Sequence, residues 1–268
     1  MITTRSYSCV SFCRRLLRKK LINTHHYKTP ITYKFYTGKQ HFSDFTKSKI
    51  STQCLIKEIT EVSRDHLTPE ISLQLITPNC PLWHSGEDQC PFPDPFWAFY
   101  WPGGQALTRF ILDNGELFRG KTVVDVGCGC GASSIACRMV VAAHVIANDI
   151  DTVAAEAVEL NTELNNVTQT TVTTSNLVGC HDNRWDILLF GDMFYDTNFA
   201  NVITEWVVSL YTNGVTIFIG DPGRLPFEQH PLKSDLKMVA EYALPENCLK
   251  ENNGLSCGFV WKYEPGNT

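Results

Sequence analysis

The chain has 268 residues, of which 43% are hydrophobic and 11% aromatic, so it can bury a sizeable core and is not a largely disordered chain. Its net charge of −5 is unevenly distributed, because residues 1–43 carry nine Lys or Arg and no acid. The remaining residues hold 14 basic and 28 acidic side chains, a charge of −14. That charge argues against a nucleic-acid partner. No apolar stretch approaches the ~18 residues that span a bilayer, so no membrane insertion is expected.

Residues 1–43 have the composition of a mitochondrial transit peptide: basic, free of acids and rich in Ser and Thr. Phe12, Leu16 and Leu21 can line one face of a short helix whose other face is basic. The alternative is a disordered basic arm that binds nucleic acid or anionic lipid.

The cysteines and histidines predict neither disulfides nor a metal site. The chain has 11 cysteines, an odd number scattered without zinc spacing, and no secretory signal precedes them. The histidines form no HxxxH or HExxH cluster.

In chain order, the first elements after residue 44 belong to an extension that we place at 44–95. A helix is predicted at 53–64 and a strand at 71–76, followed by an irregular stretch with five prolines over 77–95. The main domain is predicted to occupy 96–268, and Pro102 begins a helix that runs to about Leu112.

Strands and helices then alternate. Short apolar, β-branched strands are predicted at 121–126, 144–149, 170–175, 185–191 and 214–220, with helices at 131–141, 152–166 and 198–210. Continuous apolar strands of this kind are typical of a sheet covered on both faces. The tail is predicted to form a helix near 227–240 and a hairpin of strands near 240–244 and 255–262. The fold class is therefore α/β, a doubly wound sheet whose ligand binds at the carboxyl ends of the strands.

The strongest motif is the glycine loop VVDVGCGCG, which follows the first strand of the main domain and opens a helix. Glycines at 127, 129 and 131 let the backbone turn tightly and approach a ligand. The pattern Gly127-x-Gly129-x-x-Ala132 also satisfies a permissive NAD or FAD fingerprint. Asp125 favours S-adenosylmethionine, because a carboxylate can hold the amino group of its methionine part but would repel a pyrophosphate.

Two further residues follow later strands. Asp149 ends the second strand, where a carboxylate can accept hydrogen bonds from both ribose hydroxyls, and this fits either cofactor. Asp151 is predicted to cap the next helix. Asn176 follows the third strand and is either a reader of the adenine edge or an ordinary turn residue.

Asp192 and Tyr195 form a DxxY pattern after the fourth strand, where the transferable methyl group would lie. The pattern departs from the Asn/Asp-Pro-Pro-Tyr of enzymes that methylate nucleobases or glutamine amides, because Met193 and Phe194 replace both prolines. The alternative is a helix-capping Asp and a packed Tyr. Trp101 stands before Pro-Gly-Gly and can wall the cofactor pocket.

Four segments together resemble the seven-β-strand methyltransferases that modify lysines of the electron transfer flavoprotein β subunit. They are FWAFYWPGGQAL at 96–107, ANDID at 147–151, LFGDMFYD at 189–196 and IGDPGR at 219–224. The resemblance spans roughly 90–265. It implies a Rossmann-like seven-stranded sheet and an S-adenosylmethionine-dependent protein-lysine N-methyltransferase of the mitochondrial matrix. Methylation near the surface where the flavoprotein's dehydrogenases dock would modulate electron transfer.

The resemblance also implies roles for individual residues. S-adenosylmethionine would be bound by Asp125, Gly127, Gly129, Gly131 and Asp149, while Trp101 lines its pocket and Asp192 with Tyr195 frames the lysine channel. The alternatives are a methyltransferase for another mitochondrial protein or a small molecule, and a noncatalytic assembly factor with the same fold.

Overall fold

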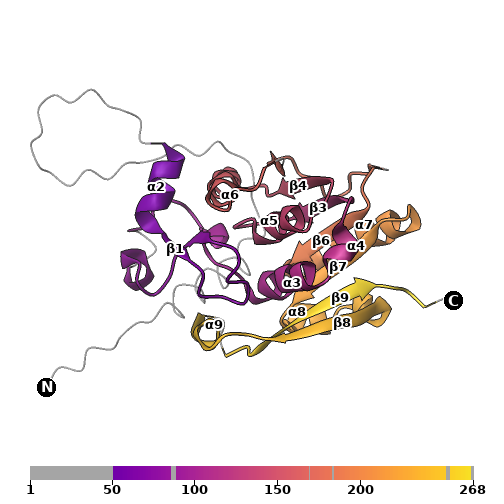
Figure 1. Ribbon diagram of the computed structural model, residues 1–268. Helices are drawn as coiled ribbons and strands as arrows, with labels where there is room; N and C mark the ends of the chain where they lie inside the picture. The colour runs from indigo at the N-terminus through magenta and orange to yellow at the C-terminus, as the bar shows by residue number, and fades with distance from the viewer. Residues whose placement is uncertain (1–50, 86–88, 169, 183, 252–253, 267–268) are drawn as a thin grey trace, which may run out of the picture.

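The computed structural model describes residues 51–85, 89–168, 170–182, 184–251 and 254–266; the predicted transit peptide lies outside them. The main domain is a seven-stranded sheet in the order β5-β4-β3-β6-β7-β9-β8 (Figure 1). Its strands are β3 (Thr122–Val126), β4 (His144–Asn148), β5 (Thr170–Thr173), β6 (Ile187–Gly191), β7 (Thr216–Asp221), β8 (Leu236–Ala243) and β9 (Cys257–Tyr263). Strands β3 to β7 are parallel, and β9 is antiparallel to both β7 and β8.

Helices cover both faces of this sheet, as predicted from its apolar strands. They are α3 (Pro102–Asp113), α4 (Gly115–Phe118), α5 (Ala132–Met139), α6 (Thr152–Leu164), α7 (Thr197–Thr212), α8 (Leu225–Glu228) and α9 (Glu246–Glu251). Among the described residues, none of the helices has the length and apolar content needed to cross a membrane.

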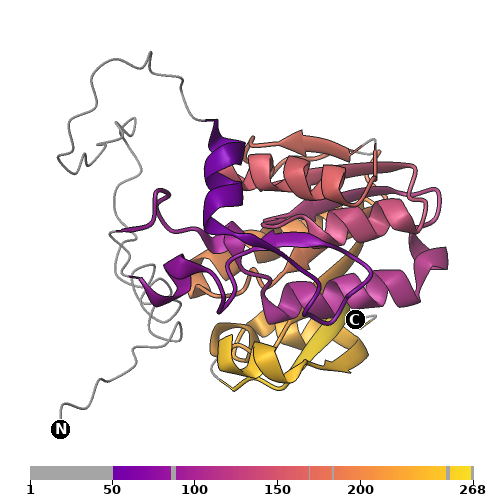
Figure 2. The same cartoon turned by 60° about the vertical axis from the view of Figure 1, so that its left-hand side comes forward.

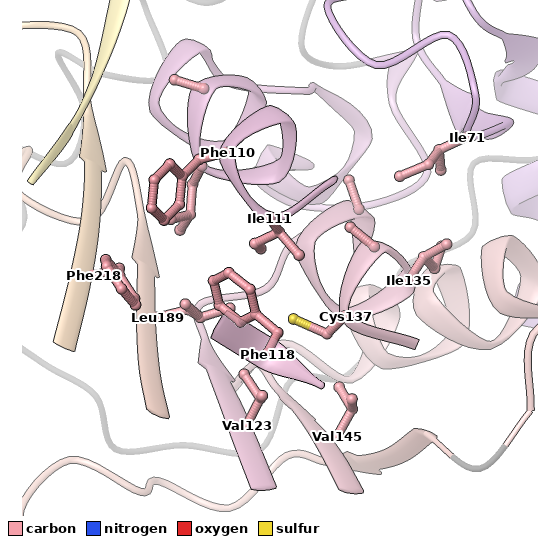
Figure 3. Close-up of a cluster of buried hydrophobic side chains, with 14 of the residues drawn as sticks. Ile71, Phe110, Ile111, Phe118, Val123, Ile135, Cys137, Val145, Leu189 and Phe218 are labelled. Atoms are coloured by element: carbon pink, nitrogen blue, oxygen red, sulfur yellow. The ribbon is translucent and has the colours of Figure 1, made fainter. Parts of the chain in front are cut away.

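Alternate residues of each strand face opposite layers. Val123, Val145, Leu189 and Phe218 point to the layer of α3 and α5, where they meet Phe110, Ile111, Phe118 and Ile135 (Figure 3). Val124, Leu188, Phe190, Ile217 and Ile219 point the other way and pack with Trp206 and Val207 of α7. This burial on both sides explains why the strands are continuous apolar runs.

The extension packs against the main domain through α6 (Figure 2). It contains α2 (Thr52–Ile59), a two-stranded sheet of β1 (Glu61–Ser63) and β2 (Leu73–Leu75), and the 3-10 helix η1 (Pro81–His84). The 3-10 helix η3 (Phe96–Ala98), at the start of the main domain, packs with it. Side-chain amides in and just after α6 also bond to the backbone of β2 and the residue before it, since Gln74 N–H donates to Asn161 Oδ1 at 2.7 Å and Ser72 N–H to Asn165 Oδ1 at 2.8 Å.

The tail differs from the prediction: the helix predicted near 227–240 does not form. Helix α8 ends at Glu228, a 3-10 helix η4 covers Pro231–Asp235, and β8 begins at Leu236. Pro231 cannot continue a helix, and residues 236–243 pair with β9, apart from a bulge between Met238 and Ala240. The predicted hairpin is confirmed, with α9 inserted between its strands.

Candidate active site

The glycine loop follows β3 at the point where strand order reverses, which is the expected position of a ligand in such sheets. Gly127, Gly129 and Gly131 have φ values of 65°, 53° and 79°, all in the left-handed region that favours glycine. A Cβ on Gly127 would also lie 2.2 Å from Met193 Sδ. The left-handed backbone therefore favours glycine at position 127, whereas the flexible Met193 side chain could move away from a Cβ.

Asp149 lies against this loop. Gly129 N–H donates to Asp149 Oδ2 at 3.0 Å, and Asp151 N–H donates to Asp149 Oδ1 at the same distance. The predicted cap is confirmed, because Asp151 Oδ1 accepts from Val153 N–H at 2.8 Å. The structure thus brings the predicted ribose ligand Asp149 to the glycine loop.

Asn148, which the sequence analysis missed, fixes the end of β4. Its side chain is 2% exposed and its Nδ2 donates to the carbonyl oxygens of Thr173 and Ser175 at 3.0 and 2.8 Å. These bonds hold the carboxyl end of β4 to the loop that leaves β5. The sequence signal for this role was an asparagine at the end of an apolar strand, directly before Asp149.

Asp125 is 2% exposed and lies beneath the start of α5. Ser134 Oγ donates to its Oδ2 at 2.7 Å. Burial raises the pKa of Asp125 to about 6, although the Ser134 hydrogen bond opposes this shift. The contacts show that Asp125 joins the loop to α5, and its contact with a cofactor stays a prediction.

Trp101 and Asn176 have local partners. Trp101 Nε1–H donates to Phe96 O at 2.9 Å, and its indole ring lies 5.8 Å from the Arg224 guanidinium carbon. Asn176 is exposed and its Oδ1 accepts from Val178 N–H at 3.1 Å, a side-chain turn. That bond fits the turn alternative for Asn176, and a role at the adenine stays a prediction.

Asp192 ties three elements together at the carboxyl edge of the sheet. Its backbone is left-handed at φ 61°, and its N–H donates to Gly220 O at 2.8 Å. Gly103 N–H, at the first turn of α3, donates to Asp192 Oδ2 at 2.8 Å. Arg224 Nε–H donates to Asp192 Oδ1 as an ion pair. Both carboxylate oxygens of Asp192 are therefore engaged, and the residue is only 7% exposed.

Asp221 completes this cluster from the end of β7. It is fully buried, and its Oδ1 accepts from the N–H groups of Gly223 and Arg224, both at 2.8 Å. Its Oδ2 has no hydrogen-bond partner among the described residues. The sequence analysis quoted Asp221 and Arg224 in IGDPGR without giving either a role, because nothing local shows that they meet Asp192.

Tyr195 lies three residues beyond Asp192, on the loop that enters α7. Its half-buried ring stacks on Phe199, with centroids 6.0 Å apart and planes 24° apart. Asp196 caps α7 by accepting from Phe199 N–H at 2.9 Å. The structure therefore puts Tyr195 at the same edge as Asp192, whereas its role as a channel wall stays a prediction.

Comparisons with known proteins agree with this geometry. The ribosomal protein L11 methyltransferase (PrmA) family matches residues 106–221. Three relatives are each named electron transfer flavoprotein beta subunit lysine methyltransferase. The protein of Xenopus laevis is 46% identical over 78% of this chain and 86% of its own length, that of Danio rerio 47% over 75% and 79%, and that of Homo sapiens 43% over 80% and 82%. The chain belongs to the electron transfer flavoprotein β-subunit lysine methyltransferase family.

Membership of this lysine methyltransferase family confirms the predicted fold, enzyme class and cofactor, S-adenosylmethionine. The residues present fit that cofactor. Asp149 offers carboxylate oxygens beside the glycine loop, and a Cβ on Gly129 would meet nothing closer than 3.8 Å. The NAD or FAD alternative is wrong.

The buried Asp221 predicts a pH-dependent stability difference. Burial, and then the charge of Asp192, raise the pKa of Asp221 to about 7. Well below pH 4 the carboxyl is protonated in both the folded and unfolded chain. As pH rises towards 7 only the unfolded chain ionises, so the free energy of unfolding falls, by up to about 4 kcal/mol.

Asp221→Asn removes that loss, because an amide does not ionise and its oxygen can still accept from Gly223 N–H. We expect the variant to gain stability over the parent progressively between pH 4 and 7, measured by urea unfolding. Asp125 titrates equally in the parent and in Asp221→Asn, so it does not contribute to the stability difference between them. A stability difference that does not change with pH would contradict the assignment.

Proposed function

We propose that this enzyme transfers methyl groups to lysines of the electron transfer flavoprotein β subunit, near its dehydrogenase-docking surface, and so modulates electron transfer. The relatives that match most of the chain are named for this substrate, and this is the observation that carries the proposal. The −14 charge of residues 44–268 supports it, because a basic protein surface is attracted to an acidic one.

The reaction places a lysine nitrogen in line with a sulfur-bound methyl group, which S-adenosylmethionine supplies in activated form. The enzyme's contribution is chiefly to hold the reacting atoms in line. A lysine of ordinary pKa, about 10.4, must lose a proton before it attacks. In the proposal, Asp192 attracts and orients the ammonium group while Tyr195 walls its channel, and the proton leaves to solvent before alignment is complete.

The remaining residue roles are proposals on the same basis. Asp149 accepts hydrogen bonds from the ribose, Asp125 and the backbone of Gly127, Gly129 and Gly131 bind the methionine part, Trp101 lines the pocket and Asn176 contacts the adenine. Residues 96–268 form the methyltransferase domain, with 44–95 as its extension.

Labelled S-adenosylmethionine tests the substrate directly. The full chain is incubated with the purified flavoprotein β subunit and, separately, with a mitochondrial extract, and labelled residues are located by mass spectrometry. We expect label on lysines of the β subunit. Label on a different protein would contradict the proposed substrate but not the methyl transfer itself. Binding of the cofactor without any transfer would favour a noncatalytic assembly factor.

A location in the mitochondrial matrix follows from the proposed substrate and from residues 1–43. Transit segments are removed on import. Sequencing the amino terminus of the protein isolated from mitochondria is expected to show that the nine basic residues are gone. If they are retained, residues 1–43 are not a transit peptide, and the alternative of a basic arm is favoured.

Asp149→Asn is expected to weaken binding of S-adenosylmethionine by roughly 10- to 100-fold, because an amide accepts from the ribose through one oxygen only and carries no charge. Calorimetric titration with the cofactor measures the change. Asp151→Asn is the matched control two residues away, since asparagine caps a helix as well as aspartate does. Equal affinities for the two variants would remove Asp149 from the cofactor site.

A further inference from the structure

A hollow of about 210 Å³ lies where the extension meets the main domain. Three separate segments form its wall: the β1–β2 sheet with the residues around it, the chain that enters α3, and α9. Leu75, Ile76 and Phe99 give it apolar sides. Gln105 also lines it, two residues after the Gly103 that donates to Asp192. The hollow and the Asp192 cluster therefore share the first turn of α3.

His66 leaves a buried hydrogen-bond donor at this hollow. The ring is 5% exposed, and Nδ1 accepts from Thr68 N–H at 3.3 Å. Burial lowers the pKa of His66 to about 4, so the ring is neutral and its proton lies on Nε2. Nε2 has no partner among the described residues. His66 is one of the residues that line the hollow, whereas Thr68 is not.

The rim of the hollow is acidic. Glu61 and Asp65 line it, and none of its described lining residues is Lys or Arg. Glu61 accepts from Thr77 Oγ1 and from Asn79 Nδ2. The carboxylate of Asp65 is exposed and makes no hydrogen bond or ion pair with the described residues, although its carbonyl oxygen accepts from Asn247 Nδ2 at 2.7 Å.

A buried donor and an acidic rim are complementary to an occupant with both an acceptor and a cation. A metal ion has no acceptor for the His66 N–H, and a phosphate would be repelled by Glu61 and Asp65. A peptide segment supplies a main-chain carbonyl oxygen and, if it contains Lys or Arg, a positive charge on a long apolar stem. The Leu75, Ile76 and Phe99 side chains suit such a stem.

We propose that this hollow is a second substrate site, which binds a Lys or Arg side chain of the protein substrate next to the lysine that is methylated. A carbonyl oxygen of the same segment accepts from His66 Nε2, and the cationic head pairs with Asp65 at the rim. The inference rests on the proposed methylation of a protein, and it makes recognition depend on a basic residue beside the target.

Asp65→Lys tests the site, with Glu205→Lys as the matched control. Glu205 is exposed on α7, which covers the opposite face of the sheet from α3, and both variants change the net charge by the same amount. We expect Asp65→Lys to raise KM for the flavoprotein β subunit roughly tenfold, with kcat and cofactor affinity unchanged. Glu205→Lys is expected to change KM less than about twofold. Equal increases would overturn the site in favour of a general charge effect.

A charge exchange identifies the partner residue. Each surface Lys or Arg of the β subunit, other than the methylated lysines, is changed to Glu and assayed with both enzymes. One change is expected to raise KM for the parent and to restore it for Asp65→Lys. No restoration at any position would overturn the local contact.

His66→Asn tests the buried end. The Asn oxygen can replace Nδ1 as acceptor for Thr68 N–H, but the Nε2 donor is lost. We expect a higher KM with unchanged kcat, and an unchanged KM in a folded variant would remove the carbonyl contact. If the parent chain does not methylate the β subunit, the proposed function has failed. If it does and the Asp65 and Glu205 variants behave alike, only the second site has failed.

Discussion

Replacing Asp192 with asparagine is expected to lower the rate of lysine methylation about 100-fold or more, while affinity for S-adenosylmethionine changes little. Asparagine tolerates the left-handed backbone at φ 61° and can still accept from Gly103 N–H. It loses the charge that pairs with Arg224, whose side chain is 15% exposed. An unpaired buried guanidinium must move, and it takes the loop after β7 with it.

Single-turnover methylation of the β subunit, with cofactor titration alongside, measures both effects. Asp196→Asn is the matched control, because Asp196 caps α7 and asparagine caps equally well. We expect that variant to keep the parental rate. A parental rate in Asp192→Asn would show that the carboxylate charge plays no part in the reaction.

The parallel strands were predictable from the sequence because their burial is symmetrical. Residues such as Val123 and Val124 face opposite layers, and both are fully buried, so the central strands β3, β6 and β7 stand out as apolar runs. Strand β8 gives no such signal. Met238 is 47% exposed and most of the strand is half-buried or exposed, so its sequence resembles a surface helix. Its pairing with β9 decides the conformation, and that information lies about 20 residues away.

The site divides in the same way. The glycine loop and Asp149 were predictable because they follow their strands directly and their residue types are determined by local backbone and chemistry. The environment of Asp192 was not, because Gly103 is 89 residues away in the chain and Arg224 is 32 away. The sequence analysis left Asp192 as a bare carboxylate facing a lysine. The structure adds that this carboxylate also accepts from Gly103 N–H and pairs with Arg224, so it is an anchor that holds α3 and the loop after β7 together at this edge.

This anchor depends on an unusually close approach of α3 to the sheet. A Cβ on Gly103 would lie 2.3 Å from Gly220 O and 2.8 Å from Gly220 C, and one on Gly220 would lie 2.0 Å from Gly103 O. Because backbone atoms are on both sides, no side-chain rotation can relieve the clash. The Gly103-Gly104 pair in the sequence is thus explained by contact rather than by flexibility at the helix start.

Gly103→Ala is therefore expected to lower the free energy of unfolding by about 3 kcal/mol or more and to abolish methylation, since α3 must lift from β7 and the Gly103 N–H leaves Asp192. Gly104→Ala provides the control one residue away. Its Cβ would meet only the Tyr100 ring, at 3.7 Å, and alanine favours a helix over glycine by up to about 1 kcal/mol. Urea unfolding should show opposite signs for the two variants. If Gly103→Ala unfolds at the parental urea concentration, α3 is not held to the sheet by this contact, and the position of Asp192 must depend on Arg224 and on the backbone bond to Gly220.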